Sequence, residues 1–216
     1  MSSRGRLNLP NIITIARIAI CPVLFLLVVA PDTGTRYGAF AVFVLAALSD
    51  VWDGHLARKH GWITDTGKLL DPLADKLLLV AVFVPFYIVS HRTGDINHVP
   101  YWGPLPAWVL VVIFGREAFM TVFRQWAQQR GVVIAAGRSG KAKTLVQSIF
   151  MAALLFWYPF VSTAVGRGWT ESEWWDPLAV GVGAVIAGTF VVALVLTVYS
   201  MIDYLWSYRA LVGVRD

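Results

Sequence analysis

The chain has 216 residues, of which 57% are hydrophobic and only 14% are charged. A soluble domain carries about 25% charged residues, so this composition excludes an ordinary soluble globular protein. The formal net charge is +5, but the basic residues lie between apolar runs and form no continuous basic stripe, which argues against a nucleic-acid-binding protein.

Six membrane-spanning helices are predicted from apolar runs that approach the roughly 20 residues needed to cross a bilayer. In chain order, the predicted spans are residues 11–30, 37–58, 67–90, 105–129, 141–163 and 178–206. Segments rich in Gly, Pro and polar residues separate them. We see no internal repeat and no second domain, so residues 1–216 are predicted to form a single all-α integral membrane domain.

Lys and Arg are distributed unevenly between the predicted loops. If both termini face the cytoplasm, 15 of the 18 Lys and Arg residues lie on that side, and only Arg36, Arg92 and Arg167 lie on the other. Cytoplasmic loops of membrane proteins are enriched in Lys and Arg. The distribution therefore predicts that both termini are cytoplasmic, although some of these basic residues also suit substrate binding.

The first predicted span carries a polar face at its start. Asn11, Thr14 and Arg17 lie within about 120° of arc on a helix. An ordinary membrane anchor does not need such a patch, so these residues are candidates for a functional site. A capped helix start with a snorkelling arginine is the alternative interpretation.

Four aspartates flank the connection between the second and third spans. The chain reads Ser49-Asp-Val-Trp-Asp-Gly-His-Leu-Ala-Arg58 and then, after eight residues, Gly67-Lys-Leu-Leu-Asp-Pro-Leu-Ala-Asp75. Asp50 and Asp53 are three residues apart and Asp71 and Asp75 are four apart, so each pair projects from one face of its helix. Because a short connection makes these helices antiparallel neighbours, the four carboxylates are predicted to converge.

Converging carboxylates need compensating positive charge, since like charges repel in a low dielectric and each loses hydration. Oxygen-only ligands suit Mg²⁺, Mn²⁺ or Ca²⁺, and no paired Cys or His set suggests zinc. Two such ions would bind a diphosphate and stabilise displacement at phosphorus. Gly54 and Gly67 leave room for a nucleotide, and Arg58 can reach a phosphate. Taken singly, such residues are typical of helix caps, helix packing and topology signals, but together they favour a functional site.

This pattern resembles a known signature. The run Asp50-x2-Asp53-Gly54-x2-Ala57-Arg58-x8-Gly67-x3-Asp71-x3-Asp75 matches that of the CDP-alcohol phosphatidyltransferases without departure. The resemblance implies a six-helix membrane bundle, a homodimer and a bacterial inner membrane with the active site facing the cytoplasm. It also implies two Mg²⁺ or Mn²⁺ ions held by Asp50, Asp53, Asp71 and Asp75, with Asp75 also acting as the base toward the acceptor hydroxyl.

Other segments resemble one branch of that family, the bacterial phosphatidylglycerophosphate synthases. They are Asn8-Leu-Pro-Asn-Ile-Ile-Thr-Ile-Ala-Arg17, Asp71-Pro-Leu-Ala-Asp-Lys76, Gly115-Arg-Glu117 with Arg124 and Trp126 downstream, and Ser139-Gly-Lys-Ala-Lys-Thr144. This branch implies CDP-diacylglycerol and sn-glycerol 3-phosphate as the substrates. The sixth span and the outward loops lie mainly outside the resemblance.

The resemblance assigns a nucleotide site and suggests where the acceptor binds. Residues expected at the CDP-lipid are Asn11, Thr14, Gly54, Ala57, Arg58, Thr64 and Gly67. Arg116 and Arg124 fall about 80° apart on the fourth helix, and Lys141 and Lys143 begin the fifth. Such a basic cluster suits a phosphorylated acceptor, while plain topology-setting charge is the alternative for all four residues.

The predicted reaction transfers the phosphatidyl group of CDP-diacylglycerol to sn-glycerol 3-phosphate, giving phosphatidylglycerophosphate and CMP. A sister enzyme with another acceptor, of the cardiolipin synthase or inositol-phosphate type, is the nearest alternative. A membrane transporter or metal channel is the alternative from another class, because intramembrane carboxylates also line transport pathways. That class predicts ionisable residues at mid-membrane depth in several spans, whereas here they cluster at the predicted cytoplasmic ends.

Overall fold

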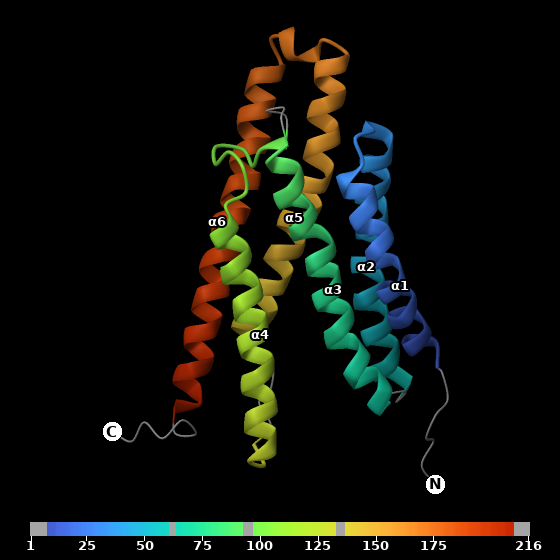
Figure 1. Ribbon diagram of the computed structural model, residues 1–216, viewed down its shortest axis with the longest axis vertical. Coiled ribbons are helices and arrows are strands. Elements are labelled where there is room, and N and C mark those ends of the chain that lie inside the picture. Colours follow the sequence, from blue (N-terminus) through green and yellow to red (C-terminus); the bar gives the residue numbers. More distant parts are fainter. Residues whose placement is uncertain (1–7, 61–63, 93–96, 133–136, 210–216) are drawn as a thin grey trace. The chain divides into compact units, whose positions relative to one another are not determined.

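The computed structural model describes residues 8–60, 64–92, 97–132 and 137–209, and within these ranges the side chains of residues 55, 57, 58, 65, 66, 68 and 138 are not described. The described chain is built from long helices (Figure 1). In order they are α1 (Leu9–Val29), α2 (Thr33–His60), α3 (Asp65–Ser90), α4 (Ala107–Gln129), α5 (Arg138–Gly166) and α6 (Trp175–Ser207), with a short 3-10 helix, η2 (Trp169–Glu171), before α6. The only β pairing in the described ranges is an isolated bridge between Val99 and Gly103.

Five of the described helices are long and apolar enough to cross a membrane. These candidate spans are Leu9–Val29, Thr33–Gly54, Leu69–Ser90, Ser139–Gly166 and Trp175–Ser207. Helix α4 is not among them, because Arg116, Glu117 and Arg124 interrupt its apolar sequence. The all-helical class and a multi-pass membrane protein are thus confirmed, and the sixth span stays a prediction.

Helix α2 begins earlier than predicted, at Thr33. The Asp32 carboxylate accepts hydrogen bonds from the Thr35 amide at 2.7 Å and from the Thr35 hydroxyl at 2.8 Å. These bonds cap the helix start, and they hold the pKa of Asp32 below its ordinary value. The break between the first two helices is therefore shorter than Pro31 and Gly34 alone predict.

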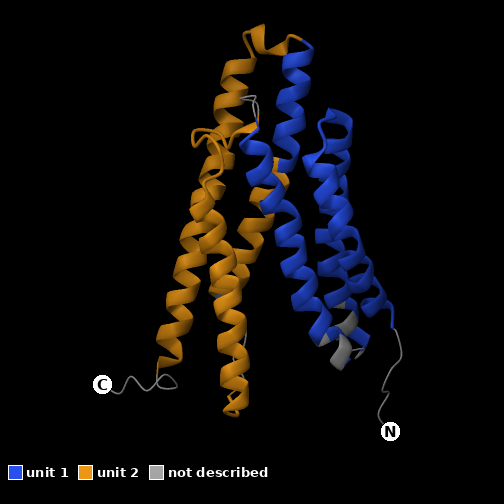
Figure 2. Ribbon diagram, in the orientation of Figure 1, with its two compact units in different colours: residues 1–96, 155–167 blue, residues 97–154, 168–216 orange. Residues whose placement is uncertain are grey.

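The helices form two compact units (Figure 2). Unit 1 comprises Met1–Ile96 with Leu155–Arg167, and unit 2 comprises Asn97–Leu154 with Gly168–Asp216. Helix α5 contributes its first part to unit 2 and its last part to unit 1. The single domain over residues 1–216 stays a prediction.

In unit 1, α1 packs against both α2 and α3 through one buried stripe. The buried residues recur at helical spacing and are Asn11, Thr14, Arg17, Cys21, Leu24 and Val28. The stripe is polar in its first half and apolar in its second, so the same face that forms the core also delivers polar groups to α2 and α3. The Asn8 side chain caps the start of α1 by accepting a hydrogen bond from the backbone N–H of Asn11 at 3.2 Å.

In unit 2, α4 packs against α6. The buried stripe of α6 repeats every three or four residues and comprises Gly183, Ile186, Phe190, Ala193, Thr197, Ser200 and Tyr204. Such spacing keeps one face of a helix in contact with its neighbours. The last three members are polar, and α4 carries the buried Arg116 toward them.

Candidate active site

In unit 1, three of the four predicted aspartates surround Arg17. Its guanidinium donates hydrogen bonds to the carboxylates of Asp50 and Asp53, and one of its nitrogens lies 3.6 Å from the Asp75 carboxylate. The Arg17 side chain is only 1% exposed, whereas those of Asp50 and Asp75 are 44% and 58% exposed and that of Asp53 is 6% exposed. Two helices thus bring their carboxylates to one buried cation on a third.

Thr14 connects the fourth aspartate to this cluster. The Thr14 hydroxyl donates to the Asp71 carboxylate at 2.9 Å and lies 3.5 Å from a carboxylate oxygen of Asp53. Thr14 is almost fully buried, and Asp71 is exposed. The predicted convergence of the four carboxylates is therefore observed, with Arg17 and Thr14 of α1 at its centre. We call these six residues the carboxylate cluster.

Asn11 and Thr64 join the start of α1 to the start of α3. The side-chain amide nitrogen of Asn11 donates a hydrogen bond to the Thr64 hydroxyl at 2.9 Å. The same hydroxyl accepts a hydrogen bond from the backbone N–H of Gly67 at 3.0 Å. A Cβ at Gly67 would lie 2.8 Å from the Asn11 side-chain oxygen and 3.2 Å from the Thr64 hydroxyl, so it would displace this hydrogen-bonded pair. A close helix approach thus accounts for Gly67 independently of any nucleotide.

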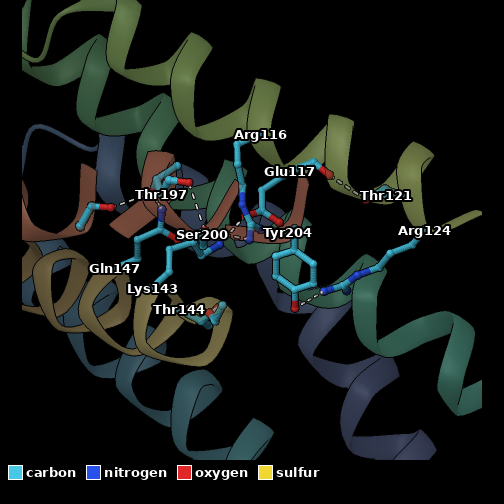
Figure 3. Close-up of polar contacts among 12 residues, drawn as sticks. Arg116, Glu117, Thr121, Arg124, Lys143, Thr144, Gln147, Thr197, Ser200 and Tyr204 are labelled. Atoms are coloured by element: carbon cyan, nitrogen blue, oxygen red, sulfur yellow. Dashed lines mark hydrogen bonds and ion pairs between the residues drawn. The ribbon is translucent and has the colours of Figure 1, made fainter. Parts of the chain in front are cut away.

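In unit 2, two of the predicted basic residues share one carboxylate. The Lys143 ammonium donates to Glu117, and the Arg116 guanidinium donates to the same oxygen at 3.0 Å (Figure 3). Arg116 also donates to the Ser200 hydroxyl at 3.0 Å. Arg116 and Lys143 are 7% and 4% exposed, so Glu117 neutralises part of a buried positive charge.

The other two basic residues are exposed. Arg124 donates to the Tyr204 hydroxyl at 3.3 Å (Figure 3). The Lys141 side chain makes no ion pair with any described residue. The predicted acceptor cluster is therefore divided into a buried pair held by Glu117 and an exposed pair, Arg124 and Lys141.

Comparison with known proteins decides the family. A family model described as CDP-alcohol phosphatidyltransferase matches residues 7–207. The chain belongs to the CDP-alcohol phosphatidyltransferase family. Relatives of this phosphatidyltransferase carry the name CDP-diacylglycerol–glycerol-3-phosphate 3-phosphatidyltransferase. The Bacillus subtilis (strain 168) protein is 37% identical over 68% of this chain and 76% of its own length. The Shigella flexneri serotype 5b (strain 8401) and Escherichia coli (strain K12) proteins are 32% and 30% identical, each over 94% of this chain and 96% of their own length.

Members of this phosphatidyltransferase family generally use a divalent metal ion, and the chemistry of the carboxylate cluster fits one. Four carboxylates and a single guanidinium carry a net charge of −3. Hard divalent cations bind such all-oxygen donor sets. Among the described residues, no group of three or more Asp, Glu, Cys or His side chains has the geometry of a metal-binding site. The Arg17 guanidinium lies between the carboxylates, and the ligand set stays a prediction.

Three other positions predicted at the nucleotide site of the phosphatidyltransferase, Gly54, Ala57 and Arg58, lie on α2. Gly54 lies half-buried in α2, one residue after Asp53. Ala57 and Arg58 lie in the last turns of α2, but their side chains are outside the described part of the chain. The predicted role of these three positions at the nucleotide therefore stays a prediction.

Two sets of contacts were not anticipated from the sequence. The sequence places Arg17 on a polar helix face, but it does not identify the three aspartates that Arg17 contacts. On α6, Asp203 accepts a hydrogen bond from Ser139 at 2.6 Å, and Tyr204 and Ser200 contact the basic cluster. The buried stripe of α6 is visible as a spacing of three and four residues, so this signal could have identified Ser200 and Tyr204.

Proposed function

We propose that this chain transfers the phosphatidyl group of CDP-diacylglycerol to sn-glycerol 3-phosphate, producing phosphatidylglycerophosphate and CMP. The observation that carries the proposal is the convergence of Asp50, Asp53, Asp71 and Asp75 on Arg17 and Thr14 in a member of this family. The names of the relatives support the two substrates. The divided basic cluster of unit 2 supports a phosphorylated acceptor.

The carboxylate cluster is proposed to bind the diphosphate of the CDP-lipid. Asp50, Asp53, Asp71 and Asp75 would hold two Mg²⁺ or Mn²⁺ ions, which when bound neutralise the diphosphate and the developing charge on the leaving group. The nucleotide is assigned to the neighbouring positions, which are Asn11, Thr14, Gly54, Ala57, Arg58, Thr64 and Gly67. Asn11 and Thr14 support this assignment through their position, because Thr14 donates a hydrogen bond to Asp71 and Asn11 donates one to Thr64 within the same unit.

The acceptor is proposed to bind through its phosphate to the basic residues of unit 2. Arg116, Arg124, Lys141 and Lys143 are the candidates, and the contacts of unit 2 give them different roles. Arg116 and Lys143 are buried against Glu117 and shape the site. Arg124 and Lys141 are exposed and make no described ion pair, so their charges are available to a phosphate dianion.

Asp75 is proposed to act as the general base. Among the three carboxylates near Arg17 its side chain is the most exposed, at 58%, so an acceptor hydroxyl can reach it. Asp75 takes the proton of the primary hydroxyl, and the oxygen forms a bond to the phosphorus that bears diacylglycerol. The bond from that phosphorus to the bridging oxygen breaks, and CMP leaves with the electron pair. A single displacement of this kind inverts the configuration at phosphorus.

The membrane arrangement is also part of the proposal. Helix α4 would complete a six-span bundle, with both termini and the active site on the cytoplasmic side of a bacterial inner membrane. The Lys and Arg distribution supports this orientation. A homodimer is expected from the family resemblance alone.

The test is CMP release by the purified protein in detergent with CDP-diacylglycerol and Mg²⁺, with candidate acceptors offered one at a time. Release that depends on sn-glycerol 3-phosphate is the expected result. Release only with phosphatidylglycerol or an inositol phosphate would keep the family chemistry and overturn the acceptor. No release with any acceptor, from protein that remains folded, would overturn the proposed activity.

A further inference from the structure

We infer that Tyr204 of α6 is a positioning residue of the acceptor site, because it fixes Arg124 beside the start of α5. The inference rests on the proposed function, since it assigns the acceptor phosphate to Arg124 and Lys141. It concerns α6, which carries none of the motif residues that the sequence analysis assigns to the site. The contacts that carry it all lie within unit 2.

The Tyr204 hydroxyl joins two elements that are distant in sequence. It accepts a hydrogen bond from the Arg124 guanidinium of α4 at 3.3 Å and another from the Gly137 amide just before α5. The Arg124 guanidinium also lies over the Tyr204 ring, 5.6 Å from its centroid. Tyr204 is 3% exposed, so the exposed Arg124 side chain is hydrogen-bonded to a buried hydroxyl.

The start of α5 lies close against this tyrosine. A Cβ at Gly137 or at Gly140 would lie 3.5 Å from the Tyr204 oxygen, so both glycines face it. The preceding residue of α6, Asp203, accepts a hydrogen bond from Ser139 at 2.6 Å. Two consecutive residues of α6 thus hold the first turn of α5 in place.

This arrangement gathers positive charge from separate sources. The amide groups in the first turn of a helix carry partial positive charge, and Lys141 follows in the same turn of α5. Tyr204 holds Arg124 near this turn, whereas Arg116 and Lys143 are paired with the Glu117 carboxylate. An exposed arginine otherwise samples many rotamers, and fixing it before the ligand arrives reduces the entropic cost of binding.

Substitution of Tyr204 by Phe isolates the hydroxyl. The ring and its contact with Arg124 remain, while the acceptor of the charged hydrogen bond from Arg124 and of the bond from the Gly137 amide is lost. Loss of such a bond corresponds to about a tenfold weakening of the binding it supports. We therefore expect KM for sn-glycerol 3-phosphate to rise about tenfold, with kcat and the KM for CDP-diacylglycerol unchanged.

Tyr208 provides the matched control. It lies just beyond the end of α6, with its ring stacked on that of Tyr204 at 6.5 Å between centroids. Its hydroxyl makes no hydrogen bond to a described residue. Tyr208→Phe should therefore leave both KM values and the melting temperature unchanged.

The experiment compares the wild-type protein, Tyr204→Phe, Tyr208→Phe, Arg124→Ala and the Tyr204→Phe/Arg124→Ala double variant. CMP release is measured against each substrate, and binding of sn-glycerol 3-phosphate and of inorganic phosphate is measured by calorimetry. If Tyr204 acts through Arg124, its substitution should change nothing further in the Arg124→Ala background.

Three results would overturn the inference. They are an unchanged KM for sn-glycerol 3-phosphate in Tyr204→Phe, an equal effect on both substrates together with a lower melting temperature, and a full effect that persists without Arg124. If the wild-type protein releases no CMP with sn-glycerol 3-phosphate, the proposed function fails separately. In that case the calorimetric affinity for inorganic phosphate tests the positioning role of Tyr204. A tenfold weaker affinity in Tyr204→Phe than in the wild-type protein supports the role, and equal affinities overturn it.

Discussion

Replacing Arg17 by Gln should destabilise the protein strongly. The pair between Arg17 and Asp53 is the buried one, with side chains 1% and 6% exposed. Removing one partner of a buried ion pair costs about 3–5 kcal/mol, because the other charge stays buried and uncompensated. The pairs with Asp50 and Asp75 involve carboxylates that are 44% and 58% exposed, so each adds at most about 1 kcal/mol.

The assay is thermal unfolding of the purified protein in detergent with EDTA, followed by the fluorescence of its ten Trp residues. A loss of this size should lower the melting temperature by on the order of 10 °C. Arg17→Lys keeps the charge and should lose less than half as much. Added Mg²⁺ should stabilise Arg17→Gln more than the wild-type protein, since the carboxylate cluster then carries no internal cation.

A second variant tests the physical reason. Replacing the pair together, as Arg17→Met with Asp53→Leu, removes both buried charges and should recover most of the lost stability. The reasoning is refuted if Arg17→Gln melts within about 2 °C of the wild-type protein in EDTA. It is also refuted if the double variant is less stable than the single one.

Three further predictions follow from the same site. Asp75→Asn should abolish CMP release yet still bind CDP-diacylglycerol, and a near-normal rate would exclude Asp75 as the base. Gly67→Ala should lower the free energy of unfolding by about 1–3 kcal/mol, because its Cβ would lie 2.8 Å from the Asn11 oxygen. Gly188→Ala in α6 is the control, because its Cβ would meet nothing within 4 Å. Equal melting temperatures for the two variants would contradict the steric argument. EDTA should abolish CMP release and Mg²⁺ or Mn²⁺ should restore it, so a rate insensitive to chelation would rule out the metal site.

The helices and the aspartate motif were predictable because both follow from local rules. A chain in hydrocarbon must satisfy its own backbone hydrogen bonds, so apolar runs of the right length predict helices. Spacings of three and four residues place Asp50 with Asp53 and Asp71 with Asp75 on single helix faces. Asn11 and Thr14 were identified in the same way, from the polar face of α1.

The charge partners were decided by tertiary structure. Helical periodicity predicts that a side chain faces inward, but not which group from another helix it meets. Arg17 could have remained at the membrane surface, and instead it lies among carboxylates of α2 and α3. The sequence places Arg116 and Lys143 in one basic cluster, but only the contact between α4 and α5 shows that both bind the same Glu117 oxygen.

By itself, then, the sequence determined the family and the helical class and indicated the residues to which the proposed chemistry is assigned, because these depend on composition and on spacing within one or two helices. Only the tertiary structure decided that Arg17 lies at the centre of the carboxylate cluster and that Tyr204 holds Arg124. Those contacts join residues 36 and 80 positions apart, and they depend on how whole helices pack, which no local pattern contains.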